Sequence, residues 1–156
     1  NLPGILRSFD ADTGKPQWTF HSTPPPGTPG SISGGATGGQ MWMTGTYDPE
    51  SNTLFWTTGN PWPDFYGGER KGDNLYSCSV VALDPDTGKL KWYYQFTPHD
   101  LWDWDATETP MVINANWEGQ RRMLVVQANR NGFFYVFDRE NGSVTRGQNI
   151  DGFVSS

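Results

Sequence analysis

A short unit recurs along the chain: an apolar strand, an acidic turn that carries Gly or Asn, and a second strand. The copies are "LRSFDADTGKPQW" (6–18), "TGTYDPESNTLFW" (44–56), "VVALDPDTGKLKW" (80–92) and "FYVFDRENGSVT" (134–145). A turn of this kind between two apolar strands is typical of a β-hairpin. The four turns begin at Asp10, Asp48, Asp84 and Asp138. We therefore expect a series of antiparallel hairpins.

The spacing of these turns indicates a propeller. The first three begin roughly 40 residues apart, and a repeat of about that length with about four strands per unit is typical of β-propeller blades. The interval from Asp84 to Asp138 is longer, and it contains the acidic and aromatic stretch "HDLWDWDATETP" (99–110). Because loops at one face of a rigid scaffold usually form its site, this insertion between blades is a candidate for function.

Composition supports an all-β fold class and excludes several kinds of partner. The 156 residues include 19 Gly, 12 Pro and 8 Trp, with hydrophobic residues at only 35%, so burial must come largely from aromatic side chains. A net charge of −6 leaves no basic stripe for nucleic acid. No apolar run reaches the roughly 18–20 residues of a membrane span. Cys78, the single cysteine, is expected to be a small buried apolar residue.

The start of the chain resembles the interior of a longer protein. Asn1 is followed almost at once by the first strand-and-turn unit, with no initiator Met and no signal region. We therefore expect a fragment.

Asp103 and Asp105 are the strongest candidates for chemistry. They stand two residues apart, which in an extended segment places both carboxylates on one side. Two carboxylates on one side repel each other unless a cation or a shared proton lies between them. Trp102 and Trp104 would then face the other way and anchor the loop. The alternative is a solvated acidic loop.

Three further residues could belong to a site, and each has an ordinary structural alternative. Asn60, in "TTGNPWP", follows a strand, and its amide oxygen could bind a hard cation; otherwise it forms a turn. Trp42, in "GGQMWMTG", could stack on a planar ring, although core packing is the usual role of Trp. Arg130 ends a strand, where it could bind a carboxylate in a fork or be a solvated turn residue.

Three segments, in this order and at this spacing, resemble the pyrroloquinoline quinone (PQQ)-dependent alcohol dehydrogenases, the quinoproteins related to methanol and ethanol dehydrogenase. They are "YDPESNTLFWTTGNPWP", "GDNLYSCSVVALDPDTGKLKWYYQFTPHDLWDWD" and "NRNGFFYVFDRENG". The resemblance covers nearly the whole chain. It implies that residues 1–156 are a fragment of a single quinoprotein domain, roughly three to four blades of an eight-bladed β-propeller of four-stranded antiparallel sheets.

The resemblance also implies a role for each candidate residue. Trp42 corresponds to the tryptophan on which PQQ stacks, and Asn60 to an asparagine that ligates the metal. Asp103 matches the general base, which also lies in the metal site, and Arg130 matches the arginine beside the quinone oxygens and that base. Asp105 stands where lanthanide-dependent members carry Asp and calcium-type members carry a small residue. A trivalent ion has one more charge than Ca²⁺ and prefers more oxygen ligands, so a lanthanide(III) is favoured over Ca²⁺.

The reaction implied is the oxidation of an alcohol to an aldehyde. The metal polarises the C5 carbonyl of the quinone, Asp103 takes the alcohol proton, and hydride passes to C5. Burial would raise the pKa of Asp103, whereas the cation and Arg130 would lower it, so we expect an ionised base at neutral pH. The family also implies a c-type cytochrome as electron acceptor and a periplasmic location. Its vicinal cysteine pair and upstream metal-binding glutamate have no counterpart here, so the segment alone is expected to be inactive.

Two other functions fit part of the sequence. A non-catalytic propeller of the outer-membrane assembly type shares the "DTGKxxW" repeats but has no use for a set of ligands on one face. A glycoside-processing enzyme could use Asp103 or Asp105 with Glu108 as its two carboxylates. Asp100 has no predicted role, and the sequence does not identify the alcohol or the oligomeric state.

Overall fold

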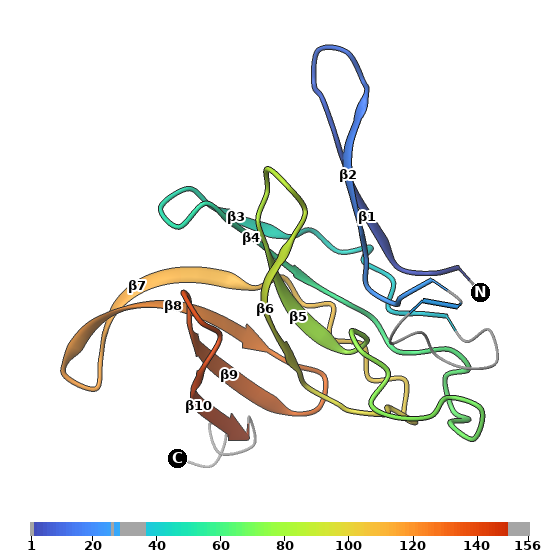
Figure 1. The fold of residues 1–156 in the computed structure, drawn as a ribbon. Coiled ribbons are helices and arrows are strands. Elements are labelled where there is room, and N and C mark those ends of the chain that lie inside the picture. The colour runs from blue at the N-terminus through green and yellow to red at the C-terminus, as the bar shows by residue number, and fades with distance from the viewer. Residues whose placement is uncertain (1, 26, 29–36, 150–156) are drawn as a thin grey trace.

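The structure is a computed structural model that describes residues 2–25, 27–28 and 37–149. These residues form ten β-strands (Figure 1), and none of them belongs to a helix that is long and apolar enough to cross a membrane. The strands are β1 (Ile5–Phe9), β2 (Pro16–His21), β3 (Thr46–Asp48), β4 (Thr53–Thr57), β5 (Ser79–Leu83), β6 (Leu90–Gln95), β7 (Met111–Trp117), β8 (Gln120–Ala128), β9 (Phe133–Asp138) and β10 (Val144–Asn149).

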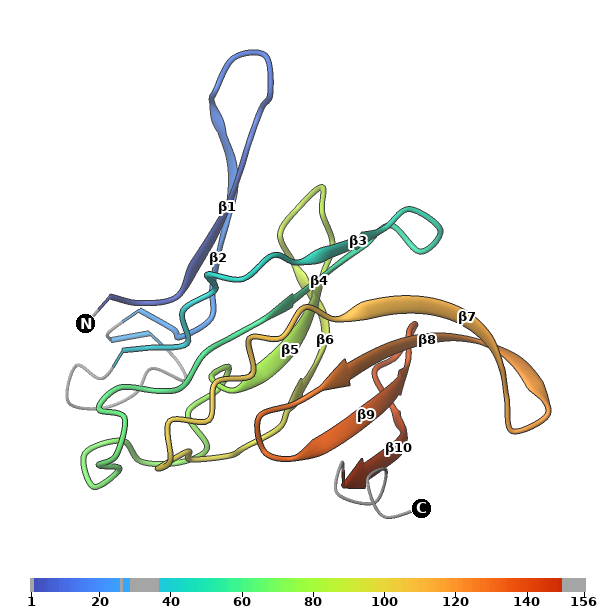
Figure 2. The ribbon, with the colours of Figure 1, turned by 180° about the vertical axis from the view of Figure 1, so that it is seen from behind.

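The strands make two four-stranded antiparallel sheets and one hairpin. One sheet has the order β3-β4-β5-β6, the other has the order β10-β9-β8-β7, and β1 pairs with β2. Figures 1 and 2 show the three units side by side, with β3–β6 between the other two. Each sheet is a meander of consecutive strands, as in a propeller blade. The described residues therefore hold two complete blades and two strands of a third, which is fewer than the three to four blades expected.

The repeat length expected from the turns was wrong, although the fold class is confirmed. Asp48 begins the turn between β3 and β4, inside the same sheet whose β5–β6 turn begins at Asp84. Equivalent turns begin at Asp10, Asp84 and Asp138. A four-stranded meander has two hairpins at the same end, and both here use an Asp turn. The spacing of roughly 40 residues between the first three turns therefore corresponds to two strands and one connection, and not to a whole blade.

Two tryptophans connect each unit to the next. The indole N–H of Trp18, in β2, donates to the carbonyl of Pro85 in the β5–β6 turn (2.7 Å). A Cβ on Gly88 would lie 2.6 Å from that ring, so the ring packs directly on the glycine. Trp92, in β6, packs in the same way on Gly142 of the β9–β10 turn. The Gly and Trp of the repeated unit therefore serve the packing of adjacent blades.

The main core lies between the two four-stranded sheets. All five residues of β5 are buried, and aromatic rings from both sheets pack together, including Trp92 with Phe137 (centroids 6.2 Å apart) and Phe96 with Tyr135 (4.8 Å). Full burial of each such ring contributes about 1.5–3 kcal/mol. Cys78 is fully buried in this cluster, as predicted, and burial raises the pKa of its thiol.

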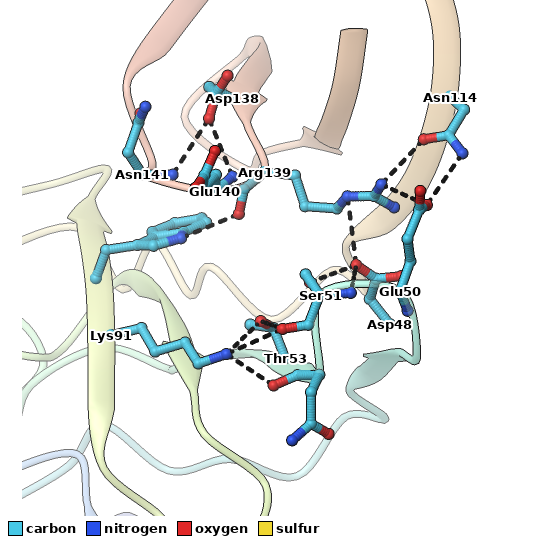
Figure 3. A network of polar contacts seen from close by, with 12 residues as sticks. Asp48, Glu50, Ser51, Thr53, Lys91, Asn114, Asp138, Arg139, Glu140 and Asn141 are labelled. Carbon is cyan, nitrogen blue, oxygen red and sulfur yellow. Dashed lines mark hydrogen bonds and ion pairs between the residues drawn. The ribbon is translucent and has the colours of Figure 1, made fainter.

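An almost completely buried arginine joins the turns of the two sheets (Figure 3). Arg139, which follows β9 and is 2% exposed, pairs through Nε with Asp48 (3.3 Å) and through Nη2 with Glu50 (2.9 Å). Its Nη2 also donates to the amide oxygen of Asn114 in β7 (3.0 Å). Ser51 completes the partners of Asp48 by donating its N–H and hydroxyl to the carboxylate. We call Asp48, Glu50, Asn114 and Arg139 the inter-blade clamp.

The connections between strands separate into two ends of the molecule. The tight hairpin turns, which include the clamp, lie at one end, and the connections β2–β3, β4–β5, β6–β7 and β8–β9 lie at the other. Figures 1 and 2 show the long connections gathered at the second end. Each of these four connections carries at least one predicted site residue, and we call this end the site end.

Candidate functional site

Asp105 is the point where three of these connections meet. Its Oδ1 accepts the backbone N–H of Asn60 (3.0 Å), from the β4–β5 connection. Its Oδ2 pairs with Nη1 of Arg130 (2.9 Å), from the β8–β9 connection. The side chain of Asp105 is 13% exposed and that of Arg130 is 50% exposed. The largely buried carboxylate of Asp105 therefore joins this residue to Asn60 and Arg130, which lie far from it in the sequence.

Trp42 and Oδ1 of Asp105 both lie against Gly59, whose lack of a side chain makes room for them. A Cβ on Gly59 would lie 2.6 Å from Cζ3 of Trp42 and 2.8 Å from Oδ1 of Asp105. The backbone around it is fixed by bonds from the Gly59 N–H to the Gln40 carbonyl (2.9 Å) and from the Gly39 N–H to the Asn60 carbonyl (2.8 Å). Trp42 is 54% exposed, so it is not a core residue.

Gly59 was not predicted from the sequence as a site residue. Its only sequence signal is its place before Asn60 in "TTGNPWP", where a glycine also fits an ordinary turn. The structure shows instead that it is the contact surface for an exposed aromatic ring.

The loop that carries the two aspartates is not extended as predicted. Asp103 has a φ of +61°, in the left-handed region, so alternation along a strand does not set the directions of its neighbours. Trp102 does not anchor the loop in the protein, because it is exposed, whereas Trp104 is partly buried. They stack on each other (5.0 Å between centroids, 26° between planes), and Trp102 is 56% exposed.

Asp100 holds this loop instead, which gives a role to a residue that had none. Its side chain is fully buried, and its two carboxylate oxygens accept the backbone N–H groups of Trp102 (3.3 Å) and Trp104 (3.1 Å). Its carbonyl accepts a bond from Nη2 of Arg70 (2.8 Å), which is also fully buried. Arg70 in turn donates Nε to the carbonyl of Pro63 (3.1 Å) and so joins the β4–β5 and β6–β7 connections.

The site end holds more negative than positive charge around Asp103. Burial raises the pKa of Asp103, and the charges of Asp64 and Asp100 raise it further, whereas Arg130 lowers it. Burial also raises the pKa of Asp105, whereas the hydrogen bond from the Asn60 N–H and the charge of Arg130 lower it. A bound cation would lower both values.

The oxygen atoms fit a hard cation, and this chain supplies only part of a shell. The Asn60 amide oxygen and the Asp103 and Asp105 carboxylates are oxygen ligands of the kind that Ca²⁺ and lanthanides prefer. Across the described ranges, no three His, Cys, Asp or Glu side chains are grouped to bind a metal. Both oxygens of Asp105 already have a protein partner, so its role as a ligand remains a prediction.

Arg130 binds a carboxylate, which was one of its two predicted alternatives, and Glu108 is a partly buried carboxylate. Arg130 makes its ion pair with Asp105, while its charge also lowers the pKa of Asp103. Glu108, the second carboxylate of the glycosidase alternative, has a buried Oε2 without a hydrogen-bond donor among the described residues, and burial raises its pKa.

Comparisons with known proteins identify the family and the fold. Residues 1–145 match the family described as "PQQ: Glucose/ethanol/alcohol dehydrogenase, beta-propeller domain". The quinohemoprotein alcohol dehydrogenase of Comamonas testosteroni is 38% identical over 166 residues, which cover 94% of this chain and 23% of that protein. Its crystal structure matches with a TM-score of 0.86 at 37% identity, over 95% of this chain and 25% of that one.

Two other solved structures are similar. A europium-containing methanol dehydrogenase matches with a TM-score of 0.84 and 29% identity, over 95% of this chain and 30% of that one. BamB from Moraxella catarrhalis shares the fold alone, with a TM-score of 0.52 and 13% identity over 94% of this chain and 31% of that one. The chain spans about a quarter of the length of the quinohemoprotein relative. Because the family match covers nearly the whole sequence, this chain belongs to the PQQ-dependent glucose, ethanol and alcohol dehydrogenase β-propeller family.

Proposed function

We propose that the full-length protein oxidises an alcohol to an aldehyde with PQQ and a bound cation. The observation that carries this proposal is the meeting of Asn60 and Arg130 at Asp105, with the exposed indole ring of Trp42 packed on the neighbouring Gly59. An exposed flat ring with an arginine nearby suits a planar anionic cofactor. Family membership supports the same cofactor.

Each predicted site residue has a distinct task in this reaction. Bound PQQ supplies the hydride acceptor, and the cation supplies a Lewis acid. Trp42 provides the stacking surface, and Arg130 provides donors for acidic oxygens. Asp103 accepts the proton of the alcohol hydroxyl as general base. Asn60 offers its amide oxygen, and Asp103 and Asp105 offer their carboxylates, to the cation.

For the cation we propose a lanthanide(III), with Ca²⁺ as the alternative. The second carboxylate at Asp105 and the negative charge around Asp103 both favour the ion of higher charge. The similar europium-containing methanol dehydrogenase is consistent with this choice. We further propose a c-type cytochrome as electron acceptor and the periplasm as location, by analogy with the family.

The test of this function uses the full-length protein with PQQ, alcohol and a reducible dye, and compares Asp103→Asn with the wild type. Loss of the base should lower kcat by about 10²–10⁴-fold, the range of general base catalysis. Asp12→Asn serves as the control, because Asp12 is exposed in the hairpin turn at the opposite end.

Dye reduction that depends on both PQQ and cation, and that is lost only in Asp103→Asn, supports the proposal. A wild-type protein that binds no PQQ and reduces no dye with either La³⁺ or Ca²⁺ would favour the scaffold alternative, to which only the shared fold with BamB points.

A further inference from the structure

The side chain of Asn60 is held on its nitrogen side. Nδ2 donates to Oδ1 of Asp64 (2.6 Å) and to the carbonyl of Pro61 (3.2 Å), so both amide hydrogens have an acceptor. Among the described residues, no donor contacts Oδ1 of Asn60. This oxygen is therefore the polar atom of the side chain that remains available to a ligand.

The chemistry of the two acceptors determines which way the amide points. If the amide were reversed, Oδ1 would face a carboxylate oxygen and a carbonyl oxygen, neither of which has a hydrogen to donate at neutral pH. The short distance to Asp64 makes that arrangement strongly repulsive. Asp64 and Pro61 thus select a single orientation of the amide.

The backbone of Asn60 is fixed as well. Its N–H donates to Asp105 and its carbonyl accepts from the N–H of Gly39. Because the backbone is bound on both sides, rotation about the side-chain bonds is the remaining freedom of Asn60. The hydrogen bond that Nδ2 donates to Asp64 removes it.

From this geometry we infer that Asp64 is a positioning residue for the cation site: its carboxylate orients the Asn60 amide so that Oδ1 faces the cation, and it makes that oxygen a stronger ligand. The inference rests on the proposed function, in which Asn60 binds the cation. A carboxylate that accepts a hydrogen bond from an amide N–H increases the negative charge on the amide oxygen. Residues that hydrogen-bond to a metal ligand on the side away from the metal commonly affect metal affinity in this way.

The experiment measures cation binding to the full-length protein without PQQ, by calorimetric titration with La³⁺ and with Ca²⁺. Asp64→Ala should weaken binding by about 10–100-fold, the range measured for partners of metal ligands. Asp64→Asn keeps an acceptor oxygen, so it should lose less affinity than the alanine variant. Thermal unfolding without cation should change little in either variant, because Asp64 is partly exposed.

Matched variants separate this inference from the proposed function. Asn60→Ala should lose at least as much affinity as Asp64→Ala, and Phe65→Ala, at the exposed neighbouring position, should bind as the wild type does. Unchanged binding in Asp64→Ala with weak binding in Asn60→Ala would overturn the inference alone. Unchanged binding in Asn60→Ala would overturn the inference and the ligand role of Asn60 together.

Two further outcomes also decide the question. A loss in Asp64→Asn as large as that in Asp64→Ala would contradict positioning, because the acceptor is retained there and only the charge is removed. If Asp64→Ala does not fold, Asp64→Leu removes the acceptor while filling the same space, and the same affinities apply to it.

Discussion

At the scale of single residues, the site depends on the absence of a side chain at Gly59. Gly59 has no Cβ, and this lets the ring of Trp42 lie against the backbone while Oδ1 of Asp105 accepts the N–H of Asn60. The φ of Gly59 is not in the left-handed region, so its role is to provide space and not backbone freedom. A larger residue would displace either the stacking surface or the carboxylate.

Gly59→Ala in the full-length protein should therefore weaken PQQ binding by at least about tenfold, since misplacing a contact by an ångström costs more than 1.4 kcal/mol in a tight site. The measurement is the quinone absorbance retained after reconstitution and dialysis. Gly147→Ala is the matched control, because its Cβ would meet Tyr135 only at 3.7 Å, an ordinary contact. Equal PQQ retention in the two variants would show that Trp42 does not need this glycine.

At the scale of structural elements, hairpin turns connect the blades. Trp18 and Trp92 each pack on a glycine of the following unit, and the inter-blade clamp adds a buried ion pair between the turns after β3 and β9. Asp48 is itself 4% exposed, so the guanidinium of Arg139 compensates the cost of burying its charge. The turn end of the sheets thus holds the blades together, and their site ends are free for loops.

Arg139→Met should lower the free energy of unfolding by about 3–5 kcal/mol, because Asp48 would keep its buried charge without a cation. Denaturant unfolding of the full-length protein measures this, with Arg121→Met, on the exposed surface of β8, as control. Adding Asp48→Asn to Arg139→Met should recover part of the loss, since the orphaned charge is then removed. A double variant no more stable than Arg139→Met would argue against the ion pair as the cause.

At the scale of the whole molecule, charge is distributed unevenly between the two ends. The turn end neutralises its buried carboxylate with Arg139, whereas the site end gathers Asp64, Asp100 and Asp103 with Arg130 bound to Asp105. Burial lowers the pKa of Arg70, and the nearby charge of Asp100 offsets part of that lowering. A bound cation stabilises an end that has an excess of carboxylates. The stabilisation increases with the charge of the cation.

La³⁺ should therefore raise the unfolding temperature of the PQQ-free full-length protein more than Ca²⁺ does at equal concentration. Asp105→Ala should reduce the advantage of La³⁺, because it removes the carboxylate that favours the trivalent ion. Asp86→Ala, in the β5–β6 turn at the opposite end, should leave the advantage intact. If Ca²⁺ stabilises the wild type as much as La³⁺, and Asp105→Ala changes neither, the lanthanide proposal is wrong.

The sequence by itself determined the local structure and the family. Asp turns followed by Gly and Trp specify hairpins through hydrogen bonds within a few residues, as the bonds from Thr13 to Asp10 and from Thr87 to Asp84 show. The burial of Cys78 was predicted correctly from the apolar run around it, although the residue lies in the turn before β5 and not in a strand. Local patterns could not give the number of strands per repeat, because both hairpins of the β3–β6 blade use an Asp turn.

Only the tertiary structure decided which atoms meet. Trp42, Asn60, Asp105 and Arg130 come from four different connections, and their contacts depend on how the sheets orient those connections. Local alternation could not reveal the positive φ of Asp103, the bonds from the loop backbone to buried Asp100 or the exposure of Trp102. Asp64 acts through its contact with Asn60 and Gly59 through its contact with Trp42, and neither Asp64 nor Gly59 stands out in the sequence. The geometry of a site built from loops is set by long-range packing, so residue type predicts its members better than their contacts.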